Sequence, residues 1–262
     1  MGHRASGAKV FVVILNWNGL KDTLECLESI QKTDYPNVDV IVVDNGSADG
    51  SPKAIREAFP GVTLLETGQN LGYADGNNVG IRYALKHGAD HVFLLNNDTT
   101  VHPEVLTHLV AAAKIAQPVA IFGSKIHYYD RPEIIWSAGV QITWDHICWK
   151  RTPCLPFRHL GMDELDRGQY AAIATVDSVV GCALFVRANL FEQIGLLDGR
   201  YFLLHEESDF CLRARKKGYL VAVVPESIVW HKVCGSFKRE PPSLHTYYNV
   251  RNSLLFISRY AP

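Results

Sequence analysis

Apolar runs and amphipathic stretches alternate along the first half of the chain. Four apolar runs that break into polar or glycine residues predict buried strands: "KVFVVILNWNG", "NVDVIVVDNGSADGS", "VTLLETGQN" and "DHVFLLNND". Four stretches with helical spacing of apolar residues follow them: "LKDTLECLESIQKT", "SPKAIREAF", "GYADGNNVGIRYALKHG" and "HPEVLTHLVAAAKI". Four strand–helix units in a row predict an α/β fold with a mostly parallel central sheet and helices on both faces.

The pattern becomes irregular in the second half. Short strands in "EIIWSAGVQITW" and a polar stretch, "RHLGMDELDRGQY", lie between residues 125 and 177. After them we predict a strand, a short helix, a longer helix and more strand: "DSVVGCALFVR", "ANLFEQIG", "ESDFCLRARKKG" and "YLVAVVPESIVWHKV". We therefore predict a single domain over residues 1–262, with a flexible leader (1–8), a nucleotide-type half (9–125) and an irregular half (126–262). The chain ends in mid-pattern on "ISRYAP", so a missing C-terminal segment stays open.

Composition and charge narrow the class of protein. The net charge of −1 provides no bulk field toward nucleic acid or anionic lipid, so we expect no nucleic-acid partner. No stretch approaches the roughly 20 apolar residues that span a bilayer, so membrane contact is expected to be peripheral at most. The six cysteines form no C-x-x-C pair and are expected to be buried thiols in a reducing cytosol: Cys26, Cys148, Cys154, Cys182, Cys211 and Cys234.

Polar side chains follow three of the predicted strands. Asn16, Asp44 and the run Asn96-Asn97-Asp98 all fall at strand carboxyl ends, where open α/β sheets bind ligands. A carboxylate at Asp44 suits a base or ribose contact, and Asn96 suits a ribose hydroxyl. Asp98 offers the hard oxygen that Mg²⁺ and Mn²⁺ prefer, with substrate phosphates completing the coordination. The alternative is plain turn chemistry, because Asp and Asn bond their own backbone where strands end.

The glycine pattern and the absence of two motifs narrow the class of nucleotide-binding protein that the sequence can encode. No G-x-G-x-x-G follows the first strand and no G-x-x-x-x-G-K-[ST] occurs, which argues against a dinucleotide dehydrogenase and a P-loop NTPase. In "GQNLGYADGNNVG", Gly72, Gly76 and Gly80 recur every four residues. This spacing fits close helix–sheet packing, or a backbone that approaches a ligand at a helix N-terminus.

A second acidic cluster lies in "LLHEESDFCLR". Glu206, Glu207 and Asp209 can be acids that the dipole of a helix N-terminus favours. Because the flank "YFLLH" is hydrophobic, they can also lie at a pocket rim, where burial raises a carboxylate pKa toward the range of a general base. His231 follows a strand and is either structural or a partner of Asp98 in a metal site.

In this order the motifs resemble the family 2 inverting glycosyltransferases of the GT-A fold, in particular the bacterial rhamnosyltransferase-like branch. The resemblance covers residues 9 to about 256. It is carried by nine stretches: "VVILNWNG", "VIVVDNGSADGS", "NLGYADGNNVGI", "LLNNDT", "DRGQY", "VVGCALFVRANLFEQIGLLD", "YFLLHEESDFCLRARKKGY", "VPESIVWHKVCGSF" and "YYNVRNSL".

The resemblance implies roles for the donor side. Asn16 and Asp44 would line the nucleotide pocket, and we add Asn70, Gly72, Asn96 and Asn97 as donor-binding candidates. Asp98 would be the ligand of a Mn²⁺ or Mg²⁺ ion at the position of the family's D-x-D motif, whose first Asp is Asn96 here. His231 matches the histidine that can complete the metal site.

On the acceptor side, the resemblance places Gly181 in a strand and the catalytic base in the acidic cluster. The family's Glu-Asp pair aligns with Glu206-Glu207, so Glu replaces the usual Asp base. We therefore rank the candidate bases as Glu207, then Asp209, then Glu206. Arg251 and Asn252 match a motif near the mouth of the site, without a role that the sequence explains.

The implied function is a metal-dependent inverting glycosyltransferase with a dTDP-rhamnose or UDP-hexose donor and a glycan or lipid-linked glycan acceptor. The implied location is the cytoplasm, including the inner face of the cytoplasmic membrane. The two halves would then bind the nucleotide-sugar and the acceptor. A sugar-nucleotide pyrophosphorylase would need a glycine-rich loop with Arg and Lys after the first strand, which "LNWNGLKD" lacks. A catalytically silent sugar-nucleotide-binding paralogue stays open because of the Glu-for-Asp change.

Overall fold

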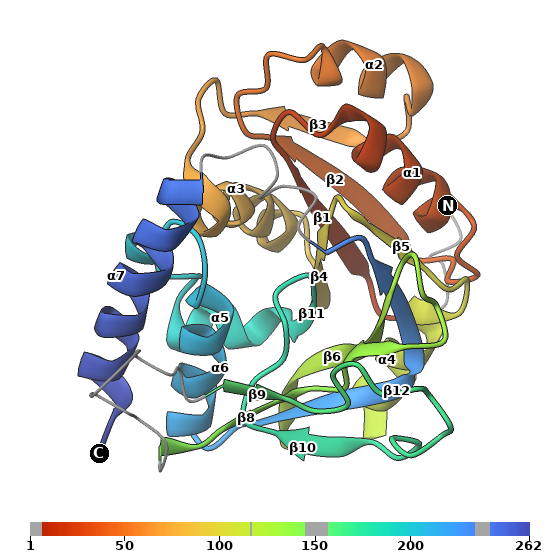
Figure 1. Cartoon of the computed structure of the whole chain (residues 1–262). Helices are drawn as coiled ribbons and strands as arrows, with labels where there is room; N and C mark the ends of the chain where they lie inside the picture. Colours follow the sequence, from red (N-terminus) through yellow and green to blue (C-terminus); the bar gives the residue numbers. More distant parts are fainter. Residues whose placement is uncertain (1–6, 116, 145–156, 234–241) are drawn as a thin grey trace.

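A computed structural model of the chain describes residues 7–115, 117–144, 157–233 and 242–262 (Figure 1). The predicted cysteines 148, 154 and 234 and most of the predicted leader lie outside these ranges. The strands are β1 (Val10–Asn16), β2 (Val38–Asp44), β3 (Thr63–Glu66), β4 (His91–Asn96), β5 (Thr99–Val101), β6 (Val119–Tyr128), β7 (Ile135–Ser137), β8 (Val140–Ile142), β9 (Phe157–His159), β10 (Ala174–Val176), β11 (Ala183–Arg187) and β12 (Leu220–His231). The helices are α1 (Leu20–Gln31), α2 (Ser51–Ala58), α3 (Gly72–Lys86), α4 (Val105–Ile115), α5 (Ala188–Ile194), the 3₁₀ turn η2 (Gly199–Tyr201), α6 (Glu206–Lys216) and α7 (Pro242–Tyr260).

One twisted sheet organises the described part of the chain. Its main path runs β10-β12-β6-β11-β4-β1-β2-β3, with β5 paired to β12 and β7 to β6. The pairs β1–β2, β1–β4, β2–β3 and β6–β12 are parallel, while β11 is antiparallel to both β4 and β6. Six of the eight strands on the main path therefore point the same way, which confirms the predicted α/β fold with a mostly parallel sheet. The carboxyl ends of β1, β2, β4 and β12 consequently lie at one edge.

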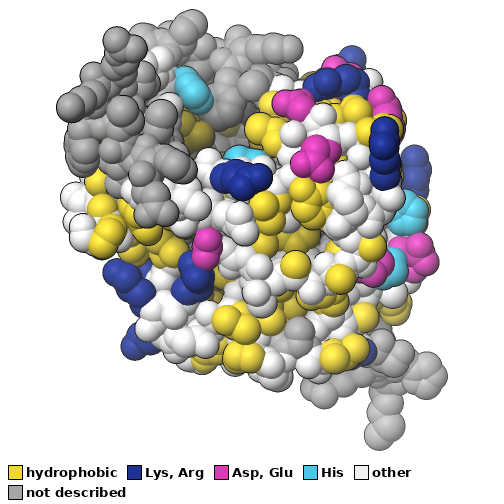
Figure 2. All heavy atoms as spheres, turned by 60° about the horizontal axis from the view of Figure 1, so that its bottom comes forward, with side chains coloured by type: hydrophobic (Ala, Val, Ile, Leu, Met, Phe, Trp, Pro, Cys, Tyr) yellow, Lys and Arg dark blue, Asp and Glu magenta, His cyan; other side chains and the backbone are white. Residues whose placement is uncertain are grey.

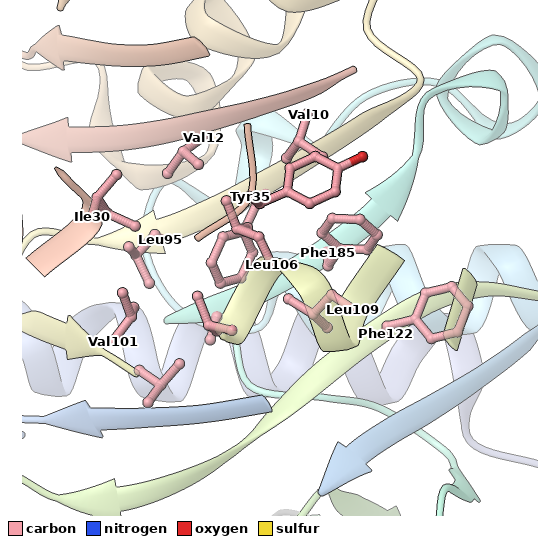
Figure 3. Close-up of a cluster of buried hydrophobic side chains, with 14 of the residues drawn as sticks. Val10, Val12, Ile30, Tyr35, Leu95, Val101, Leu106, Leu109, Phe122 and Phe185 are labelled. Atoms are coloured by element: carbon pink, nitrogen blue, oxygen red, sulfur yellow. The ribbon is translucent and has the colours of Figure 1, made fainter. Parts of the chain in front are cut away.

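Helices cover both faces of this sheet because the strands are apolar on both sides. Val10 and Val12 of β1 belong to a cluster that also contains side chains of α1, α2 and α4. Figure 3 shows these two valines close to Leu106 and Leu109 of α4 and to Phe185 of β11. A fully buried Leu or Val side chain stabilises a fold by roughly 1.5–3 kcal/mol, so this cluster fixes which helices lie on this face.

The opposite face packs against α3, α5 and α6. Phe11 and Val13 alternate with the residues just named and belong to the second cluster. A Cβ on Gly76 would lie 2.6 Å from the Leu15 side chain, and one on Gly80 would lie 2.4 Å from Val13. These two glycines let α3 approach β1 closely, which confirms the packing interpretation of their spacing.

Several elements were not predicted from the sequence, among them β5, β6, β9, β10, η2 and α7. The strand β6 crosses the expected boundary between the two halves at residue 125, and its partner β12 links it to the far edge of the sheet. The short strand β5 follows Asp98 directly, and the terminal helix α7 lies along α6 (Figure 1). Both halves of the chain therefore contribute strands to the same sheet.

Several general expectations can be compared with the structure. The three cysteines in the described ranges, Cys26, Cys182 and Cys211, are free and buried, as predicted. Within these ranges no helix has the length and apolar character required to cross a membrane. On the described part of the face in Figure 2, cationic and anionic side chains are interspersed with apolar ones.

Candidate active site

Asn16 joins the ends of three elements at the carboxyl edge of the sheet. Its Nδ2 lies 2.8 Å from Asp44 Oδ2, and its Oδ1 accepts bonds from Thr23 Oγ1 at 2.8 Å and from Asn97 Nδ2 at 3.4 Å. Asn97 Nδ2 also donates to Thr23 Oγ1 at 3.0 Å. Asn16 is fully buried, and its side-chain amide makes its hydrogen bonds to other groups of the protein. It therefore supports the carboxyl edge of the sheet from the protein interior.

Asp44 holds the loop that follows β2. Its Oδ1 accepts from the backbone N–H of Ser47 at 2.9 Å, and its side chain is nearly fully buried. The next residue, Asn45, donates to Asn70 Oδ1 at 3.0 Å and accepts from the N–H of Leu71 at 3.0 Å. The predicted donor-binding residues Asp44 and Asn70 are thus brought together through Asn45, which the sequence analysis did not single out.

The run Asn96-Asn97-Asp98 begins at the last residue of β4, and its three side chains are distributed between the protein interior and the site. Asn97 points into the bonds with Asn16 and Thr23 just described, whereas Asn96 Oδ1 is buried and has no hydrogen-bond partner. Asp98 lies against His231 from β12, with 3.2 Å between Oδ1 and Nε2. The structure therefore brings together the two residues that were predicted to bind a metal.

The Asp98–His231 pair has the chemistry of a divalent-cation site. Asp98 Oδ1 is buried and lacks a partner aligned as a hydrogen bond. Burial raises the pKa of Asp98, but His231 outweighs burial and the net shift is downward. Burial lowers the pKa of His231, but Cys182 and Asp98 raise it, to a net value of about 10. Without a metal the imidazole therefore carries a proton, which a cation would replace, because metal ligands bind deprotonated.

Two protein ligands alone make an incomplete site. In the part of the chain that the structure describes, no group of three or more His, Cys, Asp or Glu side chains is arranged to hold a metal. Mg²⁺-type sites often use one or two carboxylates together with substrate phosphates and water. The residues present fit a cation that arrives with a diphosphate.

Glu206 and Glu207 open α6, where the helix dipole favours negative charge. Burial and the charge of Glu207 raise the pKa of Glu206 well above its ordinary value. Burial also raises the pKa of Glu207, while Ser208, whose Oγ lies 3.0 Å from Glu207 Oε1, and Glu206 lower it. Glu206 thus holds the proton of the pair more tightly, and Glu207 is the partly exposed carboxylate.

Asp209 is part of an ion-pair network between α6 and α7. Its Oδ2 accepts from Arg213 Nε at 2.7 Å, and its Oδ1 accepts from Arg259 Nη1 at 2.9 Å and Tyr260 Oη at 2.7 Å. Asp209 is fully buried. Both oxygens are therefore occupied by structural partners, which speaks against Asp209 as the base.

The residues Gly181 and Cys182 lie near both the Glu206–Glu207 pair and the Asp98–His231 pair. A Cβ on Gly181 would lie 3.5 Å from Glu207 Cβ, and the carbonyl of Gly181 accepts a bond from Tyr73 Oη at 2.8 Å. Gly181 precedes β11 and does not lie in the strand as expected. The carbonyl of Cys182 accepts from the N–H of Asn96 at 3.0 Å. Burial and the nearby Glu206, Cys182, Glu207 and Asp98 raise the pKa of Tyr73.

At Gly72 the structure shows close packing, which is one of the two interpretations that the glycine spacing left open. A Cβ on Gly72 would lie 2.4 Å from the Phe202 ring, and the N–H groups of Tyr73 and Ala74 donate to the carbonyl of Phe202 at 2.6 and 3.3 Å. The start of α3 is thus occupied by the connection before α6. Neither Tyr73 nor Phe202 carries a sequence signal beyond being aromatic, so sequence reasoning missed both.

Comparison with known proteins defines the class. Residues 11–187 match the family described as Glycosyl transferase family 2. This match covers more than half of the chain, which belongs to the family 2 glycosyltransferases. The expected resemblance is confirmed.

Two curated relatives have rhamnosyltransferase names. The chain is 26% identical over 267 residues to the dTDP-rhamnosyl transferase RfbF of Shigella flexneri, covering 96% of this chain and 81% of that protein. It is 29% identical over 239 residues to the N-acetylglucosaminyl-diphospho-decaprenol L-rhamnosyltransferase of Mycobacterium tuberculosis H37Rv, covering 84% of this chain and 75% of that protein. These relatives support the rhamnosyltransferase-like branch.

Solved structures share the fold at low sequence identity. The mannosyltransferase PcManGT of Pyrobaculum calidifontis superposes with a TM-score of 0.61 at 18% identity, over 87% of this chain and 58% of that one. GalNAc-T7 superposes with a TM-score of 0.66 at 16% identity, over 86% of this chain and 44% of that one. The chain thus spans about half the length of these two proteins and has the GT-A fold.

Proposed function

We propose that this chain is a metal-dependent inverting glycosyltransferase that moves a sugar from a nucleoside-diphosphate donor to a hydroxyl of a glycan or lipid-linked glycan. The observation that carries the proposal is the arrangement around the Gly181-Cys182 turn. Gly181 approaches Glu207 and accepts a bond from Tyr73, and Cys182 interacts with His231 of the Asp98–His231 pair. Groups suited to a leaving diphosphate and to an attacking hydroxyl are therefore neighbours.

The donor would bind at the carboxyl edge of β1, β2 and β4. Asn16, Asp44 and Asn97 form the floor of this pocket, because their side chains are buried and bonded to one another or to the following loops. Asn96 Oδ1, which lacks a partner, is free to accept a bond from a donor hydroxyl. Asn70 fixes the neighbouring loop through Asn45.

Asp98 and His231 would hold Mn²⁺ or Mg²⁺ together with the diphosphate. When bound, such a cation neutralises the negative charge that grows on the departing diphosphate. PcManGT was solved with GDP-Man and Mn²⁺, and GalNAc-T7 with UDP, GalNAc and Mn²⁺, which supports a divalent cation in this fold. The Asp98 carboxylate and the diphosphate oxygens suit both Mn²⁺ and Mg²⁺.

Glu207 would act as the base. The acceptor hydroxyl attacks the anomeric carbon from the face opposite the diphosphate, so the new C–O bond forms as the bond to the diphosphate breaks and the configuration inverts. Glu207 takes the hydroxyl proton, and its raised pKa brings it toward the range that suits this role. Glu206 keeps its own proton, and Asp209 anchors α6 to α7.

The rhamnosyltransferase relatives favour dTDP-rhamnose as donor, with UDP-hexoses as the next candidates. The second of them is named for a decaprenol-linked acceptor, which favours a lipid-linked glycan and peripheral contact with a membrane. We infer a cytoplasmic protein that can work at the inner face of the cytoplasmic membrane.

The test is release of nucleoside diphosphate from a panel containing dTDP-rhamnose, UDP-glucose, UDP-N-acetylglucosamine and GDP-mannose, with Mn²⁺, with Mg²⁺ and with EDTA. Each reaction contains a glycan or prenyl-diphosphate-linked N-acetylglucosamine acceptor. Metal-dependent release with one preferred donor and a product of inverted anomeric configuration supports the proposal. Binding of donors without any release would instead indicate a silent sugar-nucleotide-binding protein, which the Glu-for-Asp change at residue 207 leaves as the alternative.

A further inference from the structure

Residues 202–205 connect η2 to α6, and their backbone is unusual. Phe202, Leu204 and His205 have positive φ angles of 60°, 72° and 74°, although none is glycine. Residues with a Cβ rarely adopt this region, because the Cβ crowds the backbone. Strained backbone of this kind persists where the surroundings hold it, and it concentrates at functional sites.

The bend is sharpest at Phe202. This residue has φ 60° and ψ −57°, and the N–H of Leu203 donates to the carbonyl of Tyr201 at 2.6 Å, which makes a strained γ-turn. The connection ends at His205 in the left-handed conformation, and α6 then starts with Glu206. The direction in which the acid pair leaves the loop therefore depends on these left-handed residues.

Asn252 of α7 holds this connection from the other side. Its Nδ2 lies 2.8 Å from the carbonyl oxygen of Tyr201, 2.5 Å from that of Leu203 and 3.0 Å from that of Leu204. Asn252 is fully buried. An amide has two N–H groups, so two carbonyls are bound directly and one shares a proton.

Two further contacts clamp the same connection. The Phe202 ring is stacked on Tyr248, one turn before Asn252 on α7, with 4.8 Å between centroids and 14° between planes. On the opposite side, the Phe202 carbonyl accepts from the N–H groups that begin α3. The connection is thus held between α3 of the donor half and α7.

The geometry points to Asn252 as a positioning residue for the sugar transfer. By holding three carbonyls of the left-handed connection, it fixes where α6 begins and therefore where the Glu207 carboxylate lies relative to the acceptor hydroxyl. This inference rests on the proposed function, in which Glu207 is the base. It also gives Asn252 a role that the sequence motif "YYNVRNSL" left unexplained.

The test compares Asn252→Leu, which keeps the size and removes the donor, with Ser253→Ala as a matched control on α7. Ser253 is buried, and its hydroxyl bonds the carbonyl of Asn249 in its own helix. For Asn252→Leu we expect kcat to fall by roughly a hundredfold, because displacement of a catalytic group by about 1 Å costs that much. The donor KM and the Kd for the product nucleoside diphosphate should stay within about threefold, and Ser253→Ala should resemble wild type throughout.

Amide hydrogen exchange supplies the structural readout. The backbone amides of residues 203–209 should exchange faster than in wild type in Asn252→Leu and at the wild-type rate in Ser253→Ala. A kcat within about threefold of wild type, or an equal loss of nucleotide affinity, would overturn the inference. If Asn252→Leu does not fold, Asn252→Ser is measured instead, with the same expected directions. If wild type releases no nucleoside diphosphate from any donor, the proposed function fails, while the exchange comparison still decides whether Asn252 holds the connection.

Discussion

Tyr73 donates a hydrogen bond from its phenol to the carbonyl oxygen of Gly181 over 2.8 Å. This bond ties α3, which begins beside the donor edge of the sheet, to the Gly181-Cys182 turn. The turn lies near both the Glu206–Glu207 pair and the Asp98–His231 pair. On that turn Gly181 packs against Glu207, and Cys182 accepts a bond from the backbone of Asn96. Donor side and acceptor side are thus joined by a short chain of contacts.

Removing this phenol should slow the reaction without unfolding the protein. Tyr73→Phe loses a bond worth about 1 kcal/mol, so we expect kcat to fall by up to about tenfold and Tm to fall by no more than about 4 °C. Tyr83→Phe, near the other end of the same helix, serves as control. Equal kcat values for the two variants would show that the Tyr73 bond does not matter for the reaction.

The Asp98–His231 pair predicts that metal binding depends on Asp98. Asp98→Asn should weaken Mn²⁺ binding, measured by calorimetry with dTDP or UDP present, and should abolish metal-stimulated turnover. EDTA should remove the activity of wild type, and Mn²⁺ or Mg²⁺ should restore it. Glu28→Gln, an exposed acid on α1, is the control and should bind the metal normally. Undiminished turnover in excess EDTA would contradict the metal role.

Replacing Glu206 by Gln should raise the stability of the folded protein at high pH but not at low pH. Its folded-state pKa is raised by burial and by Glu207, so the folded protein holds this proton more tightly than the unfolded chain does. The stability that depends on this proton is fully present below the ordinary carboxyl pKa of about 4.3 and falls as the pH rises toward the folded value. Glu206→Gln cannot ionise in either state and so lacks this pH-dependent loss; its Tm should match wild type near pH 4 and exceed it at pH 8. Since about 1 kcal/mol corresponds to about 2–4 °C, differential scanning calorimetry resolves the difference.

A Tm of Glu206→Gln that follows wild type at both pH values would show that folding does not raise the pKa of Glu206. A lower Tm at pH 8 would show that the charged form stabilises the fold, opposite to our expectation.

For Asp209 we predict that substitution lowers the stability of the protein strongly and changes the catalytic rate little. Asp209→Asn breaks the ion pairs of the buried Asp209 with Arg213 and Arg259, and of these two arginines Arg259 keeps a second carboxylate partner, Asp198. Breaking a buried pair costs about 3–5 kcal/mol, so Tm should fall by at least about 6 °C. At 20 °C the folded fraction should keep kcat within about threefold of wild type. A stable variant with no turnover would identify Asp209 as the base.

Strand ends were the most predictable part of the site. The apolar run of β4 ends in Asp98 because a buried parallel strand can carry polar residues only where it reaches the edge, and the edge of such a sheet binds ligands. The contact between Asp98 and His231 was one of two interpretations of His231, and the family resemblance favoured it. The two residues are far apart in sequence, and the parallel pairing of β6 with β12 that brings His231 to this edge has no local sequence signal.

Other contacts could not be predicted from local patterns. Asn16 was expected to touch the nucleotide, yet its bonds to Thr23 and Asp44 bury it, and these depend on how three separate elements meet. Asn252 bonds a loop some fifty residues earlier in the chain. Such bonds require the three-dimensional path of α7, which the sequence analysis did not identify as a helix.

The central claim, that Glu207 is the base of a sugar transfer, is tested most directly by single-turnover kinetics of Glu207→Gln with the preferred donor and its acceptor. Gln keeps the size of the side chain and removes its basicity, and a positioned base contributes about 10² to 10⁴ in rate. We predict at least a hundredfold fall in the transfer rate at nearly normal donor affinity, with substantial activity in Glu207→Asp. A Glu207→Gln variant that transfers sugar at the wild-type rate would contradict the account.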